Sequence, residues 1–150
     1  MSKKIIQGVI IPGISHAGGW ESELMSLVRG RTGFSQLRPG TLNVLVKEPR
    51  PEIQKDFEIK IAENPIPNRR EGYVFERCRL ARNGKVTRAL LLRTTTDYWG
   101  LQSDHRVLEF MAERNLLEFF GLNYADEIEV EFYEGPQRVE EAAAETGALS

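Results

Sequence analysis

The segment PGTLNV, residues 39–44, holds two side-chain oxygens of the kind that bind a hard cation. The turn signal Pro39-Gly40 precedes β-forming residues, so the pattern predicts a strand that begins at Thr41. Side chains alternate along a strand, which places Thr41 and Asn43 on one face, about 7 Å apart. Mg²⁺ takes one or two protein ligands and completes its shell with water and phosphate. The alternative is an ordinary strand threonine beside a turn-proximal asparagine, and these residues alone favour it.

Glu109 is a carboxylate in an apolar stretch and is a candidate general base. Its neighbours are Val107, Leu108, Phe110 and Met111. The apolar spacing predicts a helix over 104–120, and a carboxylate on a mostly buried helix is unusual unless it is paired or functional. The alternative is a solvated helix face on which Glu109 pairs with Arg106, three residues earlier.

A glycine-bearing loop, residues 13–19 (GISHAGG), lies between a predicted strand and a predicted helix. Glycines allow backbone N–H groups to approach an anion closely, and the helix that follows adds a partial positive charge. The loop matches neither a Walker A sequence nor the dinucleotide pattern GxGxxG. The candidate nucleotide contacts are Gly13, Ser15, His16, Gly18 and Gly19. A flexible connection is the alternative, and composition favours it.

The remaining reactive side chains predict no further site. Two histidines and one cysteine make a structural zinc site improbable, and Cys78 is expected in the core on the face of Val74 and Leu80. Arginines cluster around a predicted hairpin: Arg69, Arg70, Arg77, Arg79, Arg82 and Arg88. They are expected to be solvated, with a phosphate-facing patch as the alternative.

Length and composition describe one globular domain followed by a tail. The chain has 150 residues, 41% of them hydrophobic and 28% charged, which excludes a disordered chain, collagen and a disulfide scaffold. The net charge of −2 lies in residues 135–150, which have one arginine and three glutamates, so 1–134 are neutral. This balance disfavours a nucleic-acid binder. Without a membrane span or signal peptide, we expect a soluble cytoplasmic domain over 1–134 and a disordered acidic tail over 135–150.

The periodicity predicts a mainly β chain with two helices. Expected strands cover 4–11, 41–46, 57–61, 73–81, 85–92 and 127–133, and expected helices cover 20–29 and 104–120. Asn83-Gly84 suits both positive-φ positions of a type I′ turn, which predicts a hairpin. Because strands and helices do not alternate strictly, we expect a small barrel with helices across its ends.

The order of these segments resembles one family. PGTLNV is followed by the hairpin, then RTTTDYWGLQSDHRVLEFMA, then LLEFFGLNYADEIEVEF. Over residues 5–133 the chain resembles the archaeal-type riboflavin kinases, which phosphorylate riboflavin with CTP. The resemblance implies a six-stranded cradle-loop β-barrel, Mg²⁺ as cofactor, and CTP or another nucleoside triphosphate and riboflavin as partners.

The resemblance also implies roles for the candidate residues. Thr41 and Asn43 would bind Mg²⁺ and nucleotide phosphate, the 13–19 loop would contact the nucleotide, and Glu109 would be the base for the riboflavin 5′-hydroxyl. The flavin contacts would be Thr95, Thr96, Tyr98 and Trp99.

The chain departs from the family pattern at three places. Ser15 and Ala17 stand in the glycine loop, Leu116-Leu117 replaces a Leu-Arg pair, and Tyr124-Ala125-Asp126 replaces an Asp-Gly-Asp turn. Two other functions therefore stay open. The barrel could bind a nucleotide or flavin without chemistry, or it could bind DNA as related barrels do, which the neutral charge of 1–134 disfavours.

Overall fold

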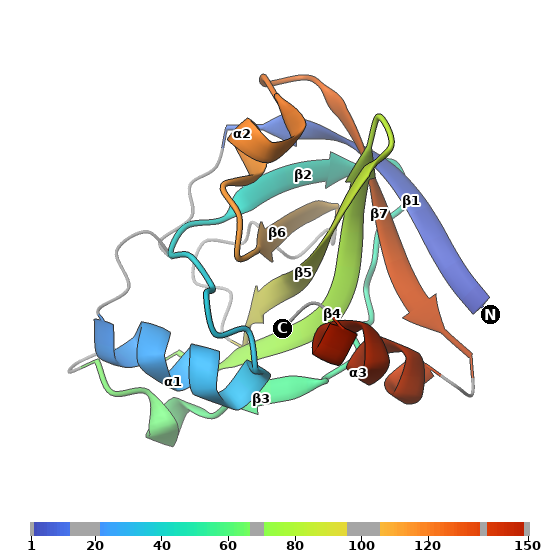
Figure 1. Cartoon of the computed structure of the whole chain (residues 1–150). Coiled ribbons are helices and arrows are strands. Elements are labelled where there is room, and N and C mark those ends of the chain that lie inside the picture. Colours follow the sequence, from blue (N-terminus) through green and yellow to red (C-terminus); the bar gives the residue numbers. More distant parts are fainter. Residues whose placement is uncertain (1, 13–21, 67–70, 96–105, 136–137, 149–150) are drawn as a thin grey trace.

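The computed structural model describes residues 2–12, 22–66, 71–95, 106–135 and 138–148, and it is mainly β (Figure 1). The strands are β1 (Ser2–Ile11), β2 (Leu42–Val46), β3 (Phe57–Ile59), β4 (Tyr73–Arg82), β5 (Lys85–Thr94), β6 (Val107–Met111) and β7 (Glu127–Glu134). The α-helices of the described ranges are α1 (Ser22–Thr32), α2 (Leu116–Phe120) and α3 (Arg138–Ala148), and one 3-10 turn covers Ile61–Glu63.

Six strands form a hydrogen-bonded ring, so the expectation of a small barrel is confirmed. Every pairing is antiparallel, in the order β4-β5-β6-β2-β1-β7, and β7 returns to β4 along Cys78–Ala81. The seventh strand, β3, pairs with the first residues of β4. The β4–β5 hairpin turns at Asn83 and Gly84 with φ values of 50° and 79°, as the type I′ prediction requires.

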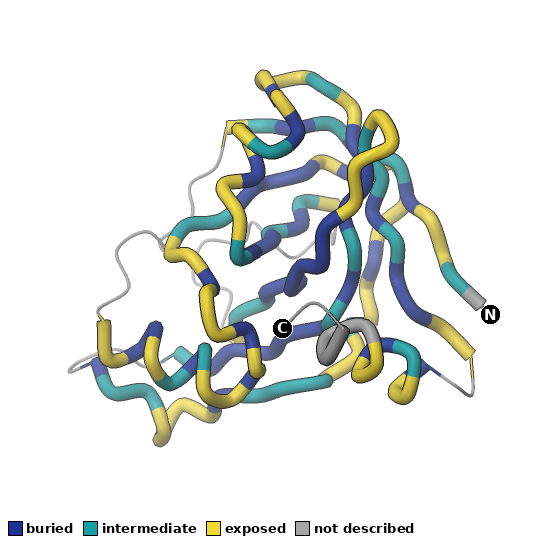
Figure 2. The backbone as a smooth tube through the Cα atoms, viewed as in Figure 1, coloured by how far each residue is buried: buried dark blue, intermediate teal, exposed yellow. Residues whose placement is uncertain are grey.

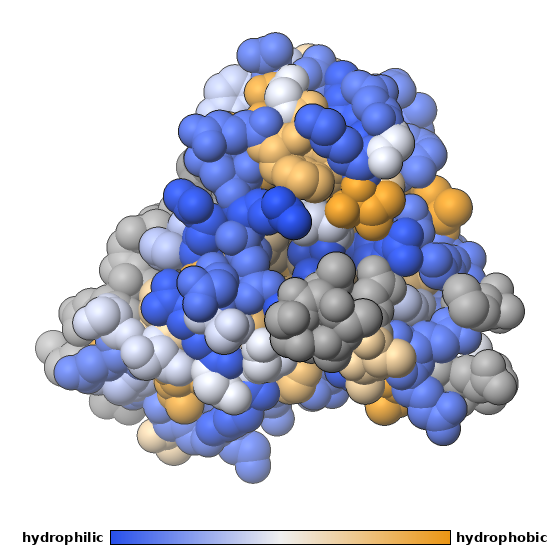
Figure 3. All heavy atoms as spheres, viewed as in Figure 1, coloured by the Kyte–Doolittle hydropathy of each residue, from blue (hydrophilic) through white to orange (hydrophobic). Residues whose placement is uncertain are grey.

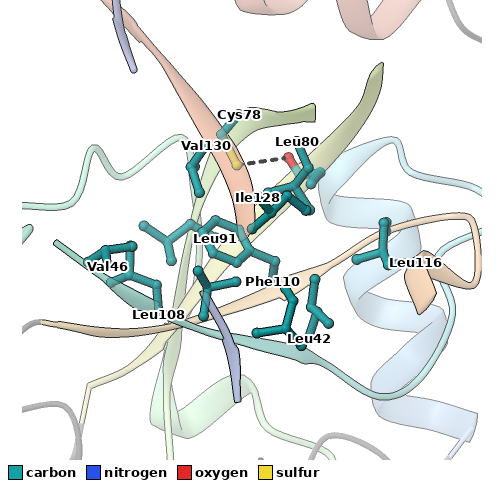
Figure 4. Close-up of a cluster of buried hydrophobic side chains, with 14 of the residues drawn as sticks. Leu42, Val46, Cys78, Leu80, Leu91, Leu108, Phe110, Leu116, Ile128 and Val130 are labelled. Carbon is teal, nitrogen blue, oxygen red and sulfur yellow. Dashed lines mark hydrogen bonds between the residues drawn. The ribbon is translucent and has the colours of Figure 1, made fainter. Parts of the chain in front are cut away.

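The barrel interior is an apolar core built from alternate residues of the strands (Figure 4). Leu42, Leu80, Leu91, Phe110 and Val130 are among the side chains that meet there. Cys78 belongs to this core, as predicted, and its thiol donates to the carbonyl of Ala89 at 3.7 Å. Helix α2 covers one end of the barrel, where Leu116 and Phe120 complete the core. Burial of these side chains supplies most of the barrel's stability.

A second apolar layer lies outside the barrel, between the sheet and α1 (Figures 1 and 2). Leu24, Met25 and Val28 of α1 pack with Phe75, Leu90 and other outward side chains of the sheet. Residues at every third or fourth position of α1 are therefore buried, as the predicted helix over 20–29 requires. Within the described ranges, no helix is both long enough and apolar enough to cross a membrane.

The predicted helix over 104–120 was wrong for its first half. Val107–Met111 forms strand β6, and only Leu116–Phe120 is helical, after the N-cap residue Asn115. Leu108 and Phe110 face the core while Glu109 faces outward. Without β6 between β2 and β5, both neighbours would expose unpaired backbone groups, and these long-range hydrogen bonds outweigh the local helical spacing.

The acidic tail also differs from the expectation of disorder, because residues 138–148 form helix α3 beside β7. Arg138 Nη2 pairs with Asp56 Oδ2 at 2.6 Å, and Ala142 is buried. The ion pair and the burial of Ala142 help to hold a segment whose composition predicts no core.

Candidate functional site

The motif of Thr41 and Asn43 lies where the chain enters β2. Thr41 immediately precedes the strand and Asn43 is its second residue, with a side chain that faces away from the barrel core. The Asn43 amide nitrogen donates to Thr41 Oγ1 across a long contact of 3.5 Å, so the two side chains lie closer together than two residues of one strand face would. Asn43 is 4% exposed, and no described group donates to its amide oxygen. The pair therefore presents two hard oxygen ligands, and the Asn43 oxygen has no hydrogen-bond donor among the described residues.

Glu109 lies directly across from Asn43. The β2–β6 register pairs Asn43 with Glu109, and the β5–β6 register pairs Glu109 with Leu92. Partners in antiparallel strands project from the same face with Cβ atoms about 5 Å apart. The structure thus brings Glu109 beside the motif, although on a strand rather than on the predicted helix.

The Glu109 carboxylate is partly buried and has no donor among the described residues. Burial raises its pKa above the ordinary value for a glutamate. Its cross-strand neighbours Asn43 and Leu92 carry no charge. A desolvated carboxylate without a partner accepts a proton more readily than a surface glutamate does, which suits a general base.

A hollow of about 260 Å³ opens beside the motif. Thr41 and Asn43 line it together with Arg38, Arg114 and Tyr124, whereas Glu109 and Thr95 do not. Apolar residues, among them Ile11, Leu42 and Phe110, also line it. The backbone N–H of Arg38 donates to the Ala112 carbonyl at 3.0 Å, which holds the segment before β2 against the end of β6 (Figure 1).

The donor set fits Mg²⁺ better than a transition metal. Magnesium prefers neutral or anionic oxygens, takes few protein ligands and keeps its waters. Thr41 Oγ1 and the Asn43 amide oxygen are both neutral oxygen ligands, and they lie at the start of β2. Across the described ranges, no cluster of three or more His, Cys, Asp or Glu side chains exists that would hold a zinc-like ion.

No protein-family model matches this chain, and a search of curated proteins also found no match.

Most of the other predicted contacts lie outside the described residues. These are Gly13, Ser15, His16, Gly18 and Gly19 of the glycine loop, and Thr96, Tyr98 and Trp99 of the predicted flavin contacts. Thr95 is described, and its Oγ1 accepts a hydrogen bond from the backbone N–H of Gly72 at 3.2 Å. Thr95 therefore helps to join the end of β5 to the start of β4, and the structure does not bring it to the hollow.

The hairpin arginines of the described chain are engaged with carboxylates. Arg77 pairs with Asp56, Arg79 with Glu131, Arg82 with Asp126, and Arg88 with Glu113. Their charges are balanced within the fold, which argues against a phosphate-facing patch on the hairpin.

Arg38, Arg114 and Tyr124 line the hollow and were not predicted as site residues. Arg38 directly precedes the PGTLNV motif, and this position in the sequence could have identified it as a site residue. Arg114 and Tyr124 are distant in sequence and come to the motif only because β6 lies beside β2 and α2 covers the barrel end.

Proposed function

We propose that the chain is a riboflavin kinase that transfers the γ-phosphate of CTP to the riboflavin 5′-hydroxyl in a Mg²⁺-dependent reaction. The observation that carries the proposal is the register pairing of Asn43 with Glu109, which joins a neutral oxygen ligand to a desolvated carboxylate. The resemblance of PGTLNV and of the segments after it to the archaeal-type riboflavin kinases supports this choice of substrates. The mainly β barrel is the architecture that the resemblance implies.

Phosphoryl transfer asks a protein for positioning and charge stabilisation more than for covalent chemistry. Glu109 accepts the proton of the flavin 5′-hydroxyl as its oxygen forms a bond to the γ-phosphorus. The bond between that phosphorus and the β–γ bridging oxygen breaks, so the products are FMN and CDP. The raised pKa of Glu109 brings its proton affinity closer to that of the transferring group.

Thr41 Oγ1 and the Asn43 amide oxygen are the atoms that would hold the cation. When bound, Mg²⁺ offsets phosphate charge as it develops on the leaving group. Burial of Asn43 fixes the amide, because the surrounding strands leave its side chain 4% exposed. A fixed ligand avoids the entropy loss that ordering a surface side chain would impose.

The test incubates the protein with riboflavin and Mg²⁺ and with one of CTP, ATP, GTP or UTP. Chromatography then separates FMN from the remaining riboflavin. FMN made with CTP and little made with ATP supports the proposal. FMN made with ATP or GTP keeps the kinase and changes the donor. No FMN with any donor, from protein shown to be folded, rejects the kinase and favours a barrel that binds a nucleotide or flavin without chemistry.

Asn43→Ala tests the proposed ligand role. The variant removes the amide oxygen from a strand that remains paired on both sides, so we expect the fold to persist and Mg²⁺-dependent turnover to be lost. Circular dichroism and thermal unfolding check the fold. Full turnover at saturating Mg²⁺ in folded Asn43→Ala would reject Asn43 as a cation ligand.

A further inference from the structure

The arginines of the described ranges fall into two groups. Most donate to a carboxylate or a backbone carbonyl, as Arg29 does to Leu37 and Arg93 does to Arg50. Within those ranges, the side chains of Arg38 and Arg114 donate no hydrogen bond and form no ion pair. Arg114 only lies over the Phe119 ring, 4.6 Å from its centroid. Both unpaired arginines line the hollow beside Thr41.

The backbone brings these two arginines together from distant parts of the chain. The hydrogen bond from Arg38 N–H to the Ala112 carbonyl, 3.0 Å long, joins their two segments two residues before Arg114. The residues lie 76 positions apart in sequence and share one hollow only because of this contact and the β2–β6 pairing. Their proximity is therefore a property of the fold rather than of a local charge run.

No carboxylate neutralises the pair inside the hollow. Among the described residues that line it there is no aspartate and no glutamate. The nearest acidic residue in sequence is Glu113, and it is already engaged: Arg88 pairs with one of its oxygens, and the Gln36 backbone N–H donates to the other at 2.8 Å. Arg38 and Arg114 thus line one hollow without a counter-ion among the described residues, and the planar donor forks of arginine match phosphate oxygens.

The size and rim of the hollow indicate which anion fits. A volume of about 260 Å³ is slightly below the ~300 Å³ at which sites for whole small molecules begin, so the hollow takes part of a nucleotide. Its lining includes Thr41 and Asn43 as well as the exposed Leu117 and Tyr124. In Figure 3, apolar atoms reach an otherwise hydrophilic surface near α2.

We propose that Arg38 and Arg114 bind the polyphosphate of the donor nucleotide in this hollow. The inference rests on the proposed function, because it assigns the phosphates that Thr41 and Asn43 would meet through the cation. The two arginines provide the fixed positive charge that a P-loop enzyme obtains from its lysine and backbone amides. They are positioning residues for the donor and take no part in proton transfer.

The experiment measures binding of inorganic tripolyphosphate and of CTP to the full chain by calorimetry, with Mg²⁺, and the KM for CTP in the FMN assay. For Arg38→Gln and Arg114→Gln we expect about a tenfold loss of affinity for both ligands, and more in the double variant, because each removes a charge-assisted contact. Arg38→Lys keeps the charge and is expected to recover part of the loss. Affinity for riboflavin is expected to stay unchanged.

A control variant separates charge at the hollow from a general loss of positive charge. Lys47→Gln removes one exposed positive charge at the far end of β2 and is expected to leave tripolyphosphate binding unchanged. A loss in Lys47→Gln as large as in the arginine variants would overturn the assignment. Thermal unfolding confirms that the variants fold, as the exposed positions of both arginines predict.

The outcomes distinguish this inference from the proposed function. Arginine-dependent tripolyphosphate binding without FMN formation keeps the anion site and rejects the kinase. FMN formation with an unchanged KM for CTP in the double variant keeps the kinase and overturns the anion site. If the unaltered protein binds neither CTP nor tripolyphosphate, the anion site is overturned. The FMN assay then tests the proposed kinase activity independently.

Discussion

Glu76 and Glu109 both lie in the middle of a strand, but they differ in their hydrogen-bond donors. This difference distinguishes a structural carboxylate from a candidate functional one. Glu76 on β4 is fully buried and accepts hydrogen bonds from Arg50 Nη2 at 2.5 Å, Arg50 Nε at 3.2 Å and the Gln54 backbone N–H at 3.1 Å. Glu109 on β6 is partly buried and accepts none from the described chain. Burial raises the pKa of both groups, but only Glu76 has donors that oppose the shift.

The donors around Glu76 serve the fold. Arg50 lies over the Phe132 ring at 3.6 Å from its centroid, and Arg93 donates to the backbone carbonyls of Arg50 and Pro51. Together these contacts form a polar network beside Phe132 in which Glu76 and Arg50 both have partners. Around Glu109 the neighbouring strands supply only Asn43 and Leu92, so its proton affinity is available to a substrate. A buried carboxylate with all its donors stabilises, whereas one without them indicates chemistry.

The largest expected effect follows from removing the unpartnered carboxylate. Glu109→Gln keeps the shape of the side chain but cannot accept the hydroxyl proton, so we expect FMN formation to fall 100- to 10,000-fold, as for the loss of a general base. Single-turnover kinetics at saturating substrates measure the loss. Glu127→Gln, an exposed change on β7, is the matched control and should keep full activity. Near-normal turnover by Glu109→Gln would remove Glu109 from the mechanism.

Removing the partnered carboxylate should affect stability instead. Glu76→Gln leaves the Arg50 guanidinium buried without a counter-ion, and we expect the free energy of unfolding to fall by about 3 kcal/mol. Urea unfolding measures it. The double variant Arg50→Met with Glu76→Leu, which replaces the pair by apolar groups, should recover part of the loss. Turnover per folded molecule should stay unchanged, and a large fall in turnover would contradict the structural assignment of Glu76.

A smaller loss is expected at the ion pair that attaches α3. Arg138 donates to Asp56, and Asp56 Oδ2 also accepts from the backbone N–H of Arg77 at 2.8 Å. Arg138→Gln removes one charge-assisted contact while Asp56 keeps its other donors, so we expect a loss of about 1–2 kcal/mol. Hydrogen exchange should rise in 138–148 more than in the barrel. Glu140→Gln, exposed on the same helix, is the control, and equal exchange in both variants would contradict the anchoring role.

Local patterns predicted most of the fold because most of its elements carry their own signals. The Asn83-Gly84 turn, the alternation in β7 and the apolar face of α1 are each visible within about ten residues. Strand β6 was missed because its five residues have apolar neighbours at helical spacing, and only pairing with β2 and β5 decides their conformation. Helix α3 was missed because its anchor, Asp56, lies 82 residues away.

The residues of the candidate site likewise differ in whether a local pattern or long-range strand pairing places them. Thr41 and Asn43 were predictable because the two oxygens lie within one short motif, and Glu109 was found as an unusual carboxylate despite the wrong element. The register that places Glu109 opposite Asn43 depends on long-range strand pairing, which no local pattern encodes. To predict that Arg114 lines the hollow, one would also have to know where the segment before α2 lies in the fold.

The smallest expected effect is a pH-dependent stability difference between the unaltered protein and Glu109→Gln. Because burial raises the pKa of Glu109 in the folded state, the folded protein binds the proton more tightly than the unfolded chain does. Ionised Glu109 therefore lowers the free energy of unfolding as pH rises above 4.5, the pKa of a glutamate in the unfolded chain, whereas glutamine has no such dependence.

Glu109→Gln should thus be the more stable protein at pH 7, and its advantage in the free energy of unfolding should shrink as pH falls toward 4. Urea unfolding between pH 4 and 7 measures the difference, with Glu127→Gln as a control whose difference stays flat. An advantage that grows toward low pH would mean that Glu109 has a donor in the folded protein, and the contrast with Glu76 would then fail.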